Sequence, residues 1–403
     1  MTTNKVKDYG DLRVTMTSDY TFVWEDRNSG ALRDVALWDP VPQGNLYPLG
    51  THAEPNWDNI NGRRASLLVG QNPNTNPSKK AVARPVSYTL IWTDQGSGAT
   101  LDGSFWRPVP PLGYVALGDV AGKGWSMPSV EKVWCVREDL VGYGKFLATS
   151  VWDDAHSGVN TDVSVWAIMA DSLGIDGSDR IPIVADTFRA QQNYERPSSN
   201  AARILLLNVG KTYNSFDVAA PKVTPDKIPM RGQQYDLTEQ AKVTLPFHCF
   251  LKPTDQSSLD NIRDPFLTVS RWIAWYVEGV WVNDTNGAFT RQTILKYGVS
   301  QTQQEQMTNS VGLEVSASYG IELANTSISL NYQFTQSSST SFTEFSEKTV
   351  TETIDVPAHN ATVLFSKHIW MKGARADGAV VIHSMEIVAN DDVYYAGCEL
   401  PTT

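Results

Sequence analysis

The sequence predicts an all-β protein in which a three-fold repeated, β-prism-like domain precedes an elongated β-sheet module. Three observations predict this class. The chain is rich in aromatic residues and glycine, with 13 Trp, 15 Tyr and 28 Gly, and turn-forming residues interrupt its β-branched runs roughly every ten residues. A tryptophan-containing pattern occurs three times in the N-terminal half. A later segment alternates between apolar and polar residues.

Composition and charge narrow the classes of function. With 403 residues, 41% hydrophobic and 19% charged, the chain is long enough for two or three domains and has the composition of a soluble globular protein. The formal net charge of −11 argues against binding to nucleic acid and against electrostatic capture by anionic lipid. Any action on a membrane is therefore expected to be specific or hydrophobic.

The repeat has the pattern Trp-x-Asp-x-x-Ser-Gly-x-x-x-Asp-x-x-x-Trp. Its copies run from Trp24 to Trp38, from Trp92 to Trp106 and from Trp152 to Trp166. Each copy is typical of a β-hairpin whose Ser-Gly turn joins two strands. Further strands are expected at 66–69, 133–136 and 203–209. Each repeat would then add one sheet to a common core packed by the tryptophans.

Each copy carries one acidic residue just before its turn and a second one after it. The first set is Asp26, Asp94 and Asp154, and the second set is Asp34, Asp102 and Asp162. An Asp before a turn accepts hydrogen bonds from local backbone N–H groups, which predicts a structural role. The alternative is a sugar site, because carboxylates accept hydroxyl protons and a Trp face covers sugar C–H groups. The second set could serve the same purpose or bind Ca²⁺, although no EF-hand loop is present.

One long stretch of the second repeat resembles the Vps62 family, which is named for a vacuolar sorting protein. It reads Phe105-Trp-Arg-Pro-Val-Pro-Pro-Leu-Gly-Tyr-Val-Ala-Leu-Gly-Asp-Val120, and Val133-Trp-Cys-Val-Arg137 follows it. The resemblance covers about Tyr20 to Val209 and implies a β-rich module without a defined catalytic site. By analogy with lectin prisms, we interpret residues 1–215 as a receptor-binding domain.

A proline-containing segment at 216–234 is the expected linker, because Pro221, Pro225 and Pro229 occur there with polar spacing. The second domain is then expected to span 235–403. Its expected strands are 235–251, 266–282, 289–299, 348–356, 362–371 and 380–388.

Residues 311–334 are expected to form a hairpin with one apolar face and a turn at Asn325–Thr326. The apolar positions are Val311, Leu313, Val315, Ala317, Tyr319, Ile321 and Leu323 on one strand, and Ile328, Leu330, Tyr332 and Phe334 on the other. A transmembrane barrel strand needs roughly 9–11 residues that are apolar toward lipid and polar toward the lumen. An antiparallel pair that covers a soluble core would show the same alternation.

The Ser/Thr/Gln-rich flanks of this hairpin, at 300–310 and 336–353, are expected to be polar strands. Such flanks around a short amphipathic hairpin resemble the pore-forming region of aerolysin-type β-pore-forming toxins. The resemblance covers about Tyr235 to the C-terminus and implies that hairpins from several subunits close into one barrel. Glu314 and Glu322 share the polar face, so they would line the lumen of the pore.

No catalytic motif is found in the sequence. The histidines show no HExxH or other metal-ligand spacing, and the chain has neither a GxSxG elbow nor a P-loop. Cys135, Cys249 and Cys398 are odd in number and widely spaced, which predicts neither a disulfide framework nor a zinc site. We expect no enzymatic activity, no catalytic residue, no metal and no cofactor.

Both resemblances imply a β-pore-forming toxin that binds a cell-surface receptor or glycan, oligomerises and inserts a β-barrel into the target-cell membrane. An insecticidal toxin that acts on animal gut cells fits this combination. Because the N-terminus lacks the apolar core of a signal peptide, we expect a soluble protein that is released by lysis, crystal formation or another route. The alternative is a Vps62-like lectin or trafficking protein that forms no pore.

Overall fold

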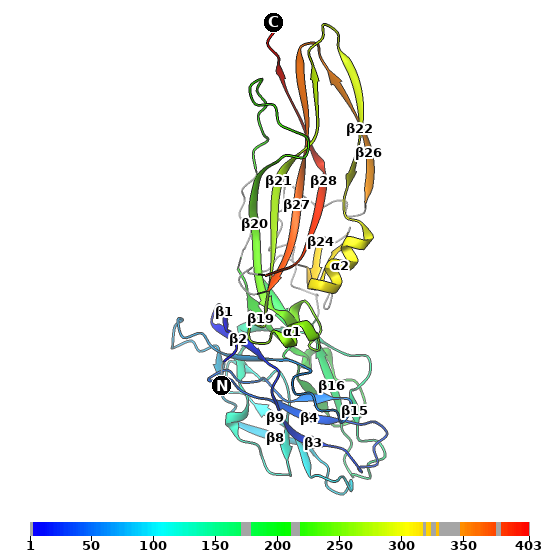
Figure 1. Cartoon of the computed structure of the whole chain (residues 1–403). Coiled ribbons are helices and arrows are strands. Elements are labelled where there is room, and N and C mark those ends of the chain that lie inside the picture. Colours follow the sequence, from blue (N-terminus) through cyan, green and yellow to red (C-terminus); the bar gives the residue numbers. More distant parts are fainter. Residues whose placement is uncertain are drawn as a thin grey trace. The chain divides into compact units, whose positions relative to one another are not determined.

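A computed structural model describes residues 3–170, 179–210, 218–316, 320–323, 328–329, 347–375 and 380–402. Strands make up nearly all of its regular structure, which confirms the all-β prediction (Figure 1). The chain contacts define two units. The N-terminal unit contains the chain up to Gly210 and the segment Pro246–Pro265, and the C-terminal unit contains Lys211–Leu245 and most of the chain from Phe266 onward. No helix among the described residues is both long and apolar enough to span a bilayer.

The tryptophan repeats form three sheets with the same strand order. In each sheet the predicted hairpin is present, and a later strand pairs with the second strand of the hairpin. The first sheet contains β3 (Tyr20–Glu25), β4 (Ala36–Pro40) and β5 (His52–Glu54); the second contains β8 (Ser87–Thr93), β9 (Gly103–Val109) and β11 (Val120–Lys123); the third contains β15 (Trp152–Asp153), β16 (Ser164–Met169) and β18 (Phe188–Gln191), with β14 (Lys145–Phe146) also on β16.

Each repeat also contributes to a second sheet, which contains the strand expected after the hairpin. This differs from the expectation of one sheet per repeat. The strands are β1 (Lys7–Tyr9), β2 (Leu12–Thr17) and β6 (Ser66–Gln71); β7 (Val82–Ala83), β10 (Tyr114–Val115) and β12 (Cys135–Arg137); and β13 (Val141–Tyr143), β17 (Arg180–Ile183) and β19 (Arg203–Asn208). Short 3-10 turns lie at η1 (Val130–Lys132), η2 (Glu138–Leu140) and η3 (Ser199–Ala201).

A closed ring of backbone hydrogen bonds joins the three repeats. The N–H of Thr51 donates to the carbonyl of Asp119 (3.0 Å), that of Asp119 to Phe188 (2.9 Å), and that of Phe188 back to Thr51 (3.3 Å). Glycine is required next to this ring, because a Cβ on Gly118 would lie 2.4 Å from the side chain of Thr187. The third repeat is therefore bonded directly to the first, and the three-fold arrangement is closed.

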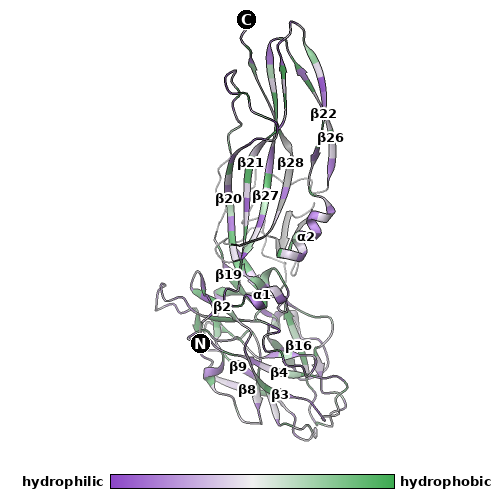
Figure 2. Cartoon of the chain, viewed as in Figure 1, coloured by the Kyte–Doolittle hydropathy of each residue, from purple (hydrophilic) through white to green (hydrophobic). Residues whose placement is uncertain are grey.

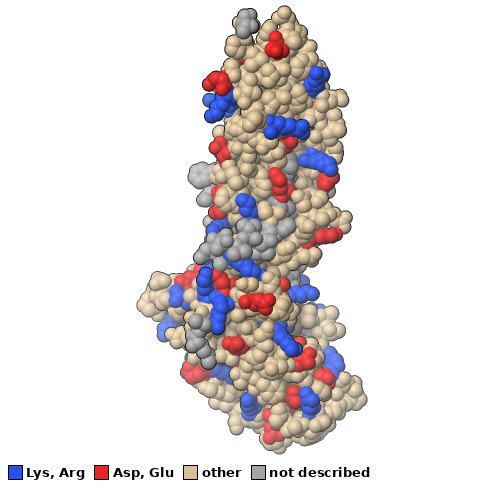
Figure 3. Space-filling model, in the orientation of Figure 1, with Lys and Arg blue, Asp and Glu red and all other residues tan. Residues whose placement is uncertain are grey.

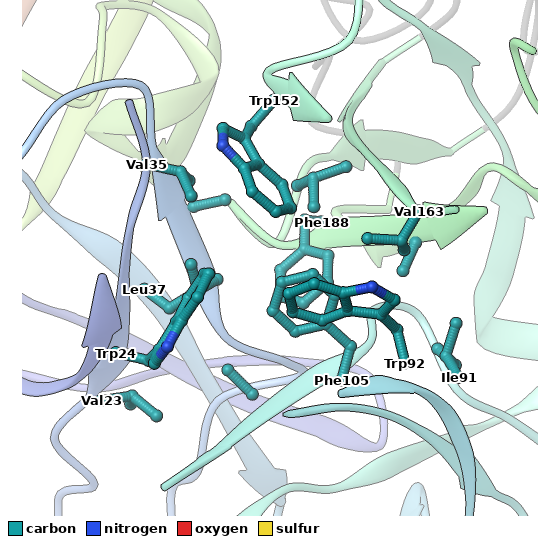
Figure 4. Packing of buried hydrophobic residues seen from close by; sticks show 14 residues of the cluster. Val23, Trp24, Val35, Leu37, Ile91, Trp92, Phe105, Trp152, Val163 and Phe188 are labelled. Carbon is teal, nitrogen blue, oxygen red and sulfur yellow. The ribbon is translucent and has the colours of Figure 1, made fainter. Parts of the chain in front are cut away.

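The core of the N-terminal unit lies between the repeats and contains the first tryptophan of each copy (Figure 4). Trp24, Trp92 and Trp152 are 0%, 2% and 0% exposed, and their ring centroids lie 5.8–5.9 Å apart in edge-to-face contacts. Edge-to-face packing is a favoured geometry of aromatic pairs. The predicted core of tryptophans is present, with Phe105 and Phe188 packed against it.

The C-terminal unit is built on one long antiparallel sheet in the order β20-β21-β27-β28 (Figure 1). Its strands are β20 (Gln234–Pro246), β21 (Phe266–Asn283), β27 (Asn360–Arg375) and β28 (Val380–Glu399). A separate two-stranded ribbon pairs β22 (Phe289–Tyr297) with β26 (Lys348–Val356). All of these strands were expected, although β27 and β28 extend beyond their predicted ends.

The described part of the expected linker packs as part of the C-terminal unit. The indole N–H of Trp275 donates to the carbonyl of Val218 (2.9 Å), and Val223 is buried in the same cluster. The spacing of the prolines predicted a linker, but apolar residues between them, such as Val223, pack on the long sheet of the C-terminal unit. The segment Pro246–Pro265, expected in the second domain, belongs to the N-terminal unit; it carries η4 (Phe247–Cys249) and α1 (Gln256–Asp260).

The polar flank before the predicted hairpin is a helix and not a strand. This helix, α2 (Gln301–Val311), begins with a capping box between Ser300 and Gln303 and ends at Gly312, whose φ of 70° suits glycine. Figure 2 colours α2 mostly hydrophilic, and its buried residues are Met307 and Val311. Val311 was expected to begin a strand, but it is the last residue of the helix.

Candidate functional site

The three repeats are linked a second time by their tryptophan and aspartate side chains. The indole N–H of Trp24 donates to Asp94 (3.1 Å), that of Trp92 to Asp154 (3.0 Å), and that of Trp152 to Asp26 (2.8 Å). Each tryptophan thus donates to the acid of the next repeat, and the last donates to the first. Figure 4 shows the three rings grouped around this centre.

Two of these acids also accept a hydrogen bond from a tryptophan of their own repeat, and the third lies beside a tyrosine. Trp57 donates to Asp26 (2.8 Å), and Trp125 donates to Asp94 (2.7 Å). In the third repeat, the hydroxyl of Tyr194 lies against Asp154 and donates to Asp162 (3.1 Å). The repeat pattern did not include these residues, although Trp57 and Trp125 follow their acids at the same spacing.

Asp26, Asp94 and Asp154 are 3–4% exposed. Burial raises the pKa of Asp26 and Asp154, and the hydrogen bonds from the backbone N–H groups of Val35 and Val163 and from the aromatic side chains oppose this rise. The oxygens of these carboxylates are occupied by donors of the protein itself. The contacts therefore support the structural role of the first acidic set.

The second acidic set lies at the surface. Asp34, Asp102 and Asp162 are all exposed, and of the three only Asp162 has a side-chain hydrogen bond to another described residue. The described residues bring together no group of three or more His, Cys, Asp or Glu side chains that could hold a metal ion. A ligand-binding role for this set stays a prediction.

The predicted hairpin lies in the segment that connects β22 to β26, and these two strands pair with each other. β22 and β26 pair without interruption from Phe289–Val356 to Tyr297–Lys348. One face of this ribbon packs through Leu295, Tyr297 and Val350, whereas the other face is exposed. The chain leaves the ribbon at Tyr297 and returns at Lys348, so the intervening segment is a loop closed by the ribbon.

The predicted single strand from Val311 to Leu323 is replaced by two short strands. After α2, β23 (Leu313–Ser316) pairs with β24 (Gly320–Leu323), and Leu313 lies opposite Leu323. This antiparallel pairing lies within the expected first strand of the hairpin, and the expected turn at Asn325–Thr326 lies outside the described residues. Glu314 and Glu322 are directly opposite in this register.

Other expected hairpin positions are only partly described. Val315 pairs with Ile321 in β23 and β24, and Ile328 lies in β25 (Ile328–Ser329), which pairs with β24. Ala317, Tyr319, Leu330, Tyr332 and Phe334 lie outside the described residues.

Residues 2–221 match the family model of vacuolar protein sorting-associated protein 62. The chain belongs to the Vps62 family. The match covers the tryptophan repeats and both sets of acids, so the expected resemblance is confirmed. No curated protein matches the chain.

Three solved structures are similar to parts of this Vps62 protein. GNIP1Aa from Chromobacterium piscinae is 26% identical over 47% of this chain and 35% of its own, with a TM-score of 0.38. Cry35Ab1 is 9% identical over 97% of this chain and 90% of its own, with a TM-score of 0.32. The oligomeric pore-forming toxin pro-Monalysin is 9% identical over 33% of this chain and 61% of its own, with a TM-score of 0.16. The matched region thus spans about a third of GNIP1Aa.

A histidine outside the Vps62 region links three strands of the C-terminal sheet. His368 Nε2 lies 2.9 Å from Glu278 Oε1, and Nδ1 lies 2.6 Å from Glu386 Oε1. Burial would lower the pKa of His368, but the two carboxylates raise it overall. Ser366 lies 2.9 Å from the same Nε2, yet it is fully buried and shares that nitrogen with Glu278. This geometry suits a link between strands better than a hydrolytic Ser-His-Glu site.

Proposed function

We propose that this Vps62 protein is a β-pore-forming toxin. Its N-terminal unit binds a receptor or glycan on the target cell, several copies associate, and the segment between β22 and β26 enters the membrane. The observation that carries this proposal is the relation between the β22–β26 register and the sequence of that segment.

Continuing the register beyond Tyr297–Lys348 without a break would pair the two arms of the predicted hairpin. The pairs would be Val311 with Phe334, Leu313 with Tyr332, Val315 with Leu330 and Ala317 with Ile328. All of these residues would lie on one face, because alternate residues of a strand share a face. That face is the one that carries Leu295 and Val350 in the ribbon. The register set by a turn at Asn325–Thr326 differs from the continued β22–β26 register by an even number of residues. The same residues would therefore lie on the apolar face in both registers.

The opposite face of this extended ribbon would be mostly polar, with Ile294 as an apolar residue on it. In the ribbon it carries the exposed residues Gln292 and Thr351, and in the segment it would carry Glu314. With a turn at Asn325–Thr326, Glu322 would also lie on this face. Apolar residues toward lipid and polar residues toward a lumen form the pattern of a membrane barrel, and closure of the barrel satisfies the strand edges. Rings of Glu314 and Glu322 would favour the passage of cations.

Charge on the surface is compatible with this mechanism. Figure 3 shows Lys and Arg interspersed with Asp and Glu on the visible face of each unit, and the net charge is −11. A broad basic surface that attracts the protein to anionic lipid is not needed if binding to a receptor or glycan brings the protein to the target cell.

Dye release from liposomes and target cells tests the proposal with two neighbouring substitutions. Leu330→Lys places a charge on the lipid face, at a cost of roughly 2–4 kcal/mol at the midplane in every subunit, and should abolish release. Asn331→Lys places the same charge on the lumenal face and should leave release intact. Ring-shaped oligomers in electron micrographs should accompany release by the wild type. Equal release by both variants would remove this segment from the pore.

A second candidate function is a lectin or trafficking protein of the Vps62 family that forms no pore. The observation that favours it is the family match, which covers most of the N-terminal unit. Binding to cells without dye release or ring formation would support this alternative.

A further inference from the structure

We propose that the second repeat carries a carbohydrate-binding site formed by the indole face of Trp125 and the carboxylate of Asp102. Its ligand would be the neutral pyranose end of a glycan. The inference rests on the proposed receptor-binding role of the N-terminal unit and identifies the class of receptor.

Trp125 combines exposure with a fixed orientation. Its side chain is 43% exposed, whereas the tryptophans at the centre of the repeats are almost fully buried. Its indole N–H donates to the buried carboxylate of Asp94 at 2.7 Å, which holds the ring at the surface. An indole fixed in this way presents a flat apolar face and loses little conformational entropy on binding, which suits stacking on the C–H face of a sugar.

Asp102 supplies a free acceptor close to that ring. Gly124, the residue before Trp125, donates its N–H to the carbonyl of Asp102 at 2.8 Å. A Cβ on Gly124 would have no atom within 4 Å, so the space beside this contact is open. The Asp102 side chain is exposed, and no hydrogen bond or ion pair joins it to another described residue. Both of its oxygens remain available to accept sugar hydroxyl protons.

The equivalent positions of the other two repeats are already engaged. In the first repeat, the guanidinium of Arg27 lies 4.3 Å from the ring centroid of Trp57 and covers one face of that indole. In the third repeat, the hydroxyl of Tyr194 donates to Asp162, so this carboxylate is not free. The second repeat therefore leaves both the ring and the acid accessible, and we assign one site to each chain.

The charge of Asp102 selects the class of sugar. A carboxylate accepts hydrogen bonds from neutral hydroxyl groups, but it repels the carboxylate of a sialic acid and the sulfate of a sulfated sugar. The ligand is therefore a neutral pyranose with an apolar C–H face and adjacent hydroxyl groups.

The test measures binding of the full chain to an array that contains neutral, sialylated and sulfated glycans. The wild type should bind neutral termini, and Trp125→Ala and Asp102→Ala should each weaken this binding about tenfold, the scale of one stacking or hydrogen-bonding contact. Trp57→Ala is the matched control, because it removes the equivalent bond to Asp26 but should not change glycan binding. Thermal melting identifies any variant that fails to fold, and Asp102→Ala removes no side-chain hydrogen bond or ion pair between described residues.

Absence of neutral glycans among the ligands of the wild type, or unchanged binding by both Trp125→Ala and Asp102→Ala, would overturn the site. Dye release from glycan-free liposomes at high protein concentration separates this inference from the pore proposal. Release there should be the same for the wild type and Asp102→Ala. If neither protein releases dye while the array result holds, the pore proposal fails and the carbohydrate site stands.

Discussion

The two units of the molecule differ in how their strands are held. In the N-terminal unit, a ring of backbone hydrogen bonds and a ring of Trp-to-Asp hydrogen bonds each close on themselves. In the C-terminal unit, the β22–β26 ribbon has one exposed face, and Ile294 on that face is 66% exposed. The ribbon buries side chains on one face only, so moving it away from its neighbours exposes less apolar surface than opening a core that is packed on all sides. This difference is consistent with the proposed function, in which the N-terminal unit binds the target cell and the segment between β22 and β26 changes conformation.

The largest expected effect comes from opening the tryptophan ring. Trp24→Ala removes a fully buried indole and leaves Asp94 without one of its donors. We expect the free energy of unfolding of the N-terminal unit to fall by about 3–5 kcal/mol, as for other buried aromatic residues. Urea unfolding measures this loss. The ribbon substitution Ile294→Ala, at an exposed position, should change stability by less than about 0.5 kcal/mol, and a similar loss for both variants would contradict the comparison.

A pH titration should separate the units through two histidines with opposite pKa shifts. Burial lowers the pKa of His248, on η4 of the N-terminal unit, to about 4. The unfolded chain then binds a proton that the folded chain does not bind between about pH 6.5 and pH 4, so stability falls by about 3 kcal/mol as the pH falls through this window. The raised pKa of His368 has the opposite effect, because its contribution is present below about pH 6.5 and is lost as the pH rises through the folded pKa.

Two variants assign these effects. His248→Phe should remove most of the acid-induced loss at 246–265, and His368→Gln should remove the alkaline loss at β21 and β27. Hydrogen exchange measured at several pH values follows both regions in one experiment. Identical pH profiles for the wild type and His248→Phe would show that this imidazole is not buried in its neutral form.

The smallest effect concerns a difference among the repeats themselves. The indole N–H of Trp106 donates to Ser104 and that of Trp166 donates to Ser164, both at 2.7 Å. Trp38 has Ala36 at the equivalent position, and its buried indole N–H has no hydrogen-bond partner among the described residues. Ala36→Ser should therefore raise stability by about 1 kcal/mol.

The reverse change, Ser104→Ala, should lower stability by about 1–3 kcal/mol, because it leaves the indole N–H of Trp106 unpaired. Thermal melting of both variants checks this pair of predictions. If Ala36→Ser and Ser104→Ala lower stability equally, the packing around residue 36 of the first repeat has no room for the serine hydroxyl.

Sequence reasoning worked best where the chain repeats. Rare Trp and Asp residues at one spacing predicted the hairpins and their common core, and the resemblance of the stretch from Phe105 to Val120 indicated the family. The same comparison could have found Trp57 and Trp125, which follow Asp26 and Asp94 at equal distances. It missed them because they lie outside the fifteen-residue pattern.

Prediction was weaker where local and long-range signals disagree. The polar composition before the hairpin suggested a strand, although Ser300 and Gln303 already carry the signature of a capping box. The place of Pro246–Pro265 in the N-terminal unit could not be predicted. It depends on contacts between distant residues, such as the bond from Ala65 N–H to the carbonyl of Pro253, and no local pattern encodes them.

The most direct test of the central claim is a scan with an environment-sensitive fluorophore attached to single cysteines from 311 to 323 in a Cys398→Ser background. Cys135 and Cys249 are buried in the folded chain, so labelling should be confined to the new cysteine. On liposomes, the emission should alternate with a period of two, with odd-numbered positions in lipid and even-numbered positions in water. Emission that does not alternate, or that is the same with and without liposomes, would contradict the proposal that this segment forms the wall of a membrane barrel.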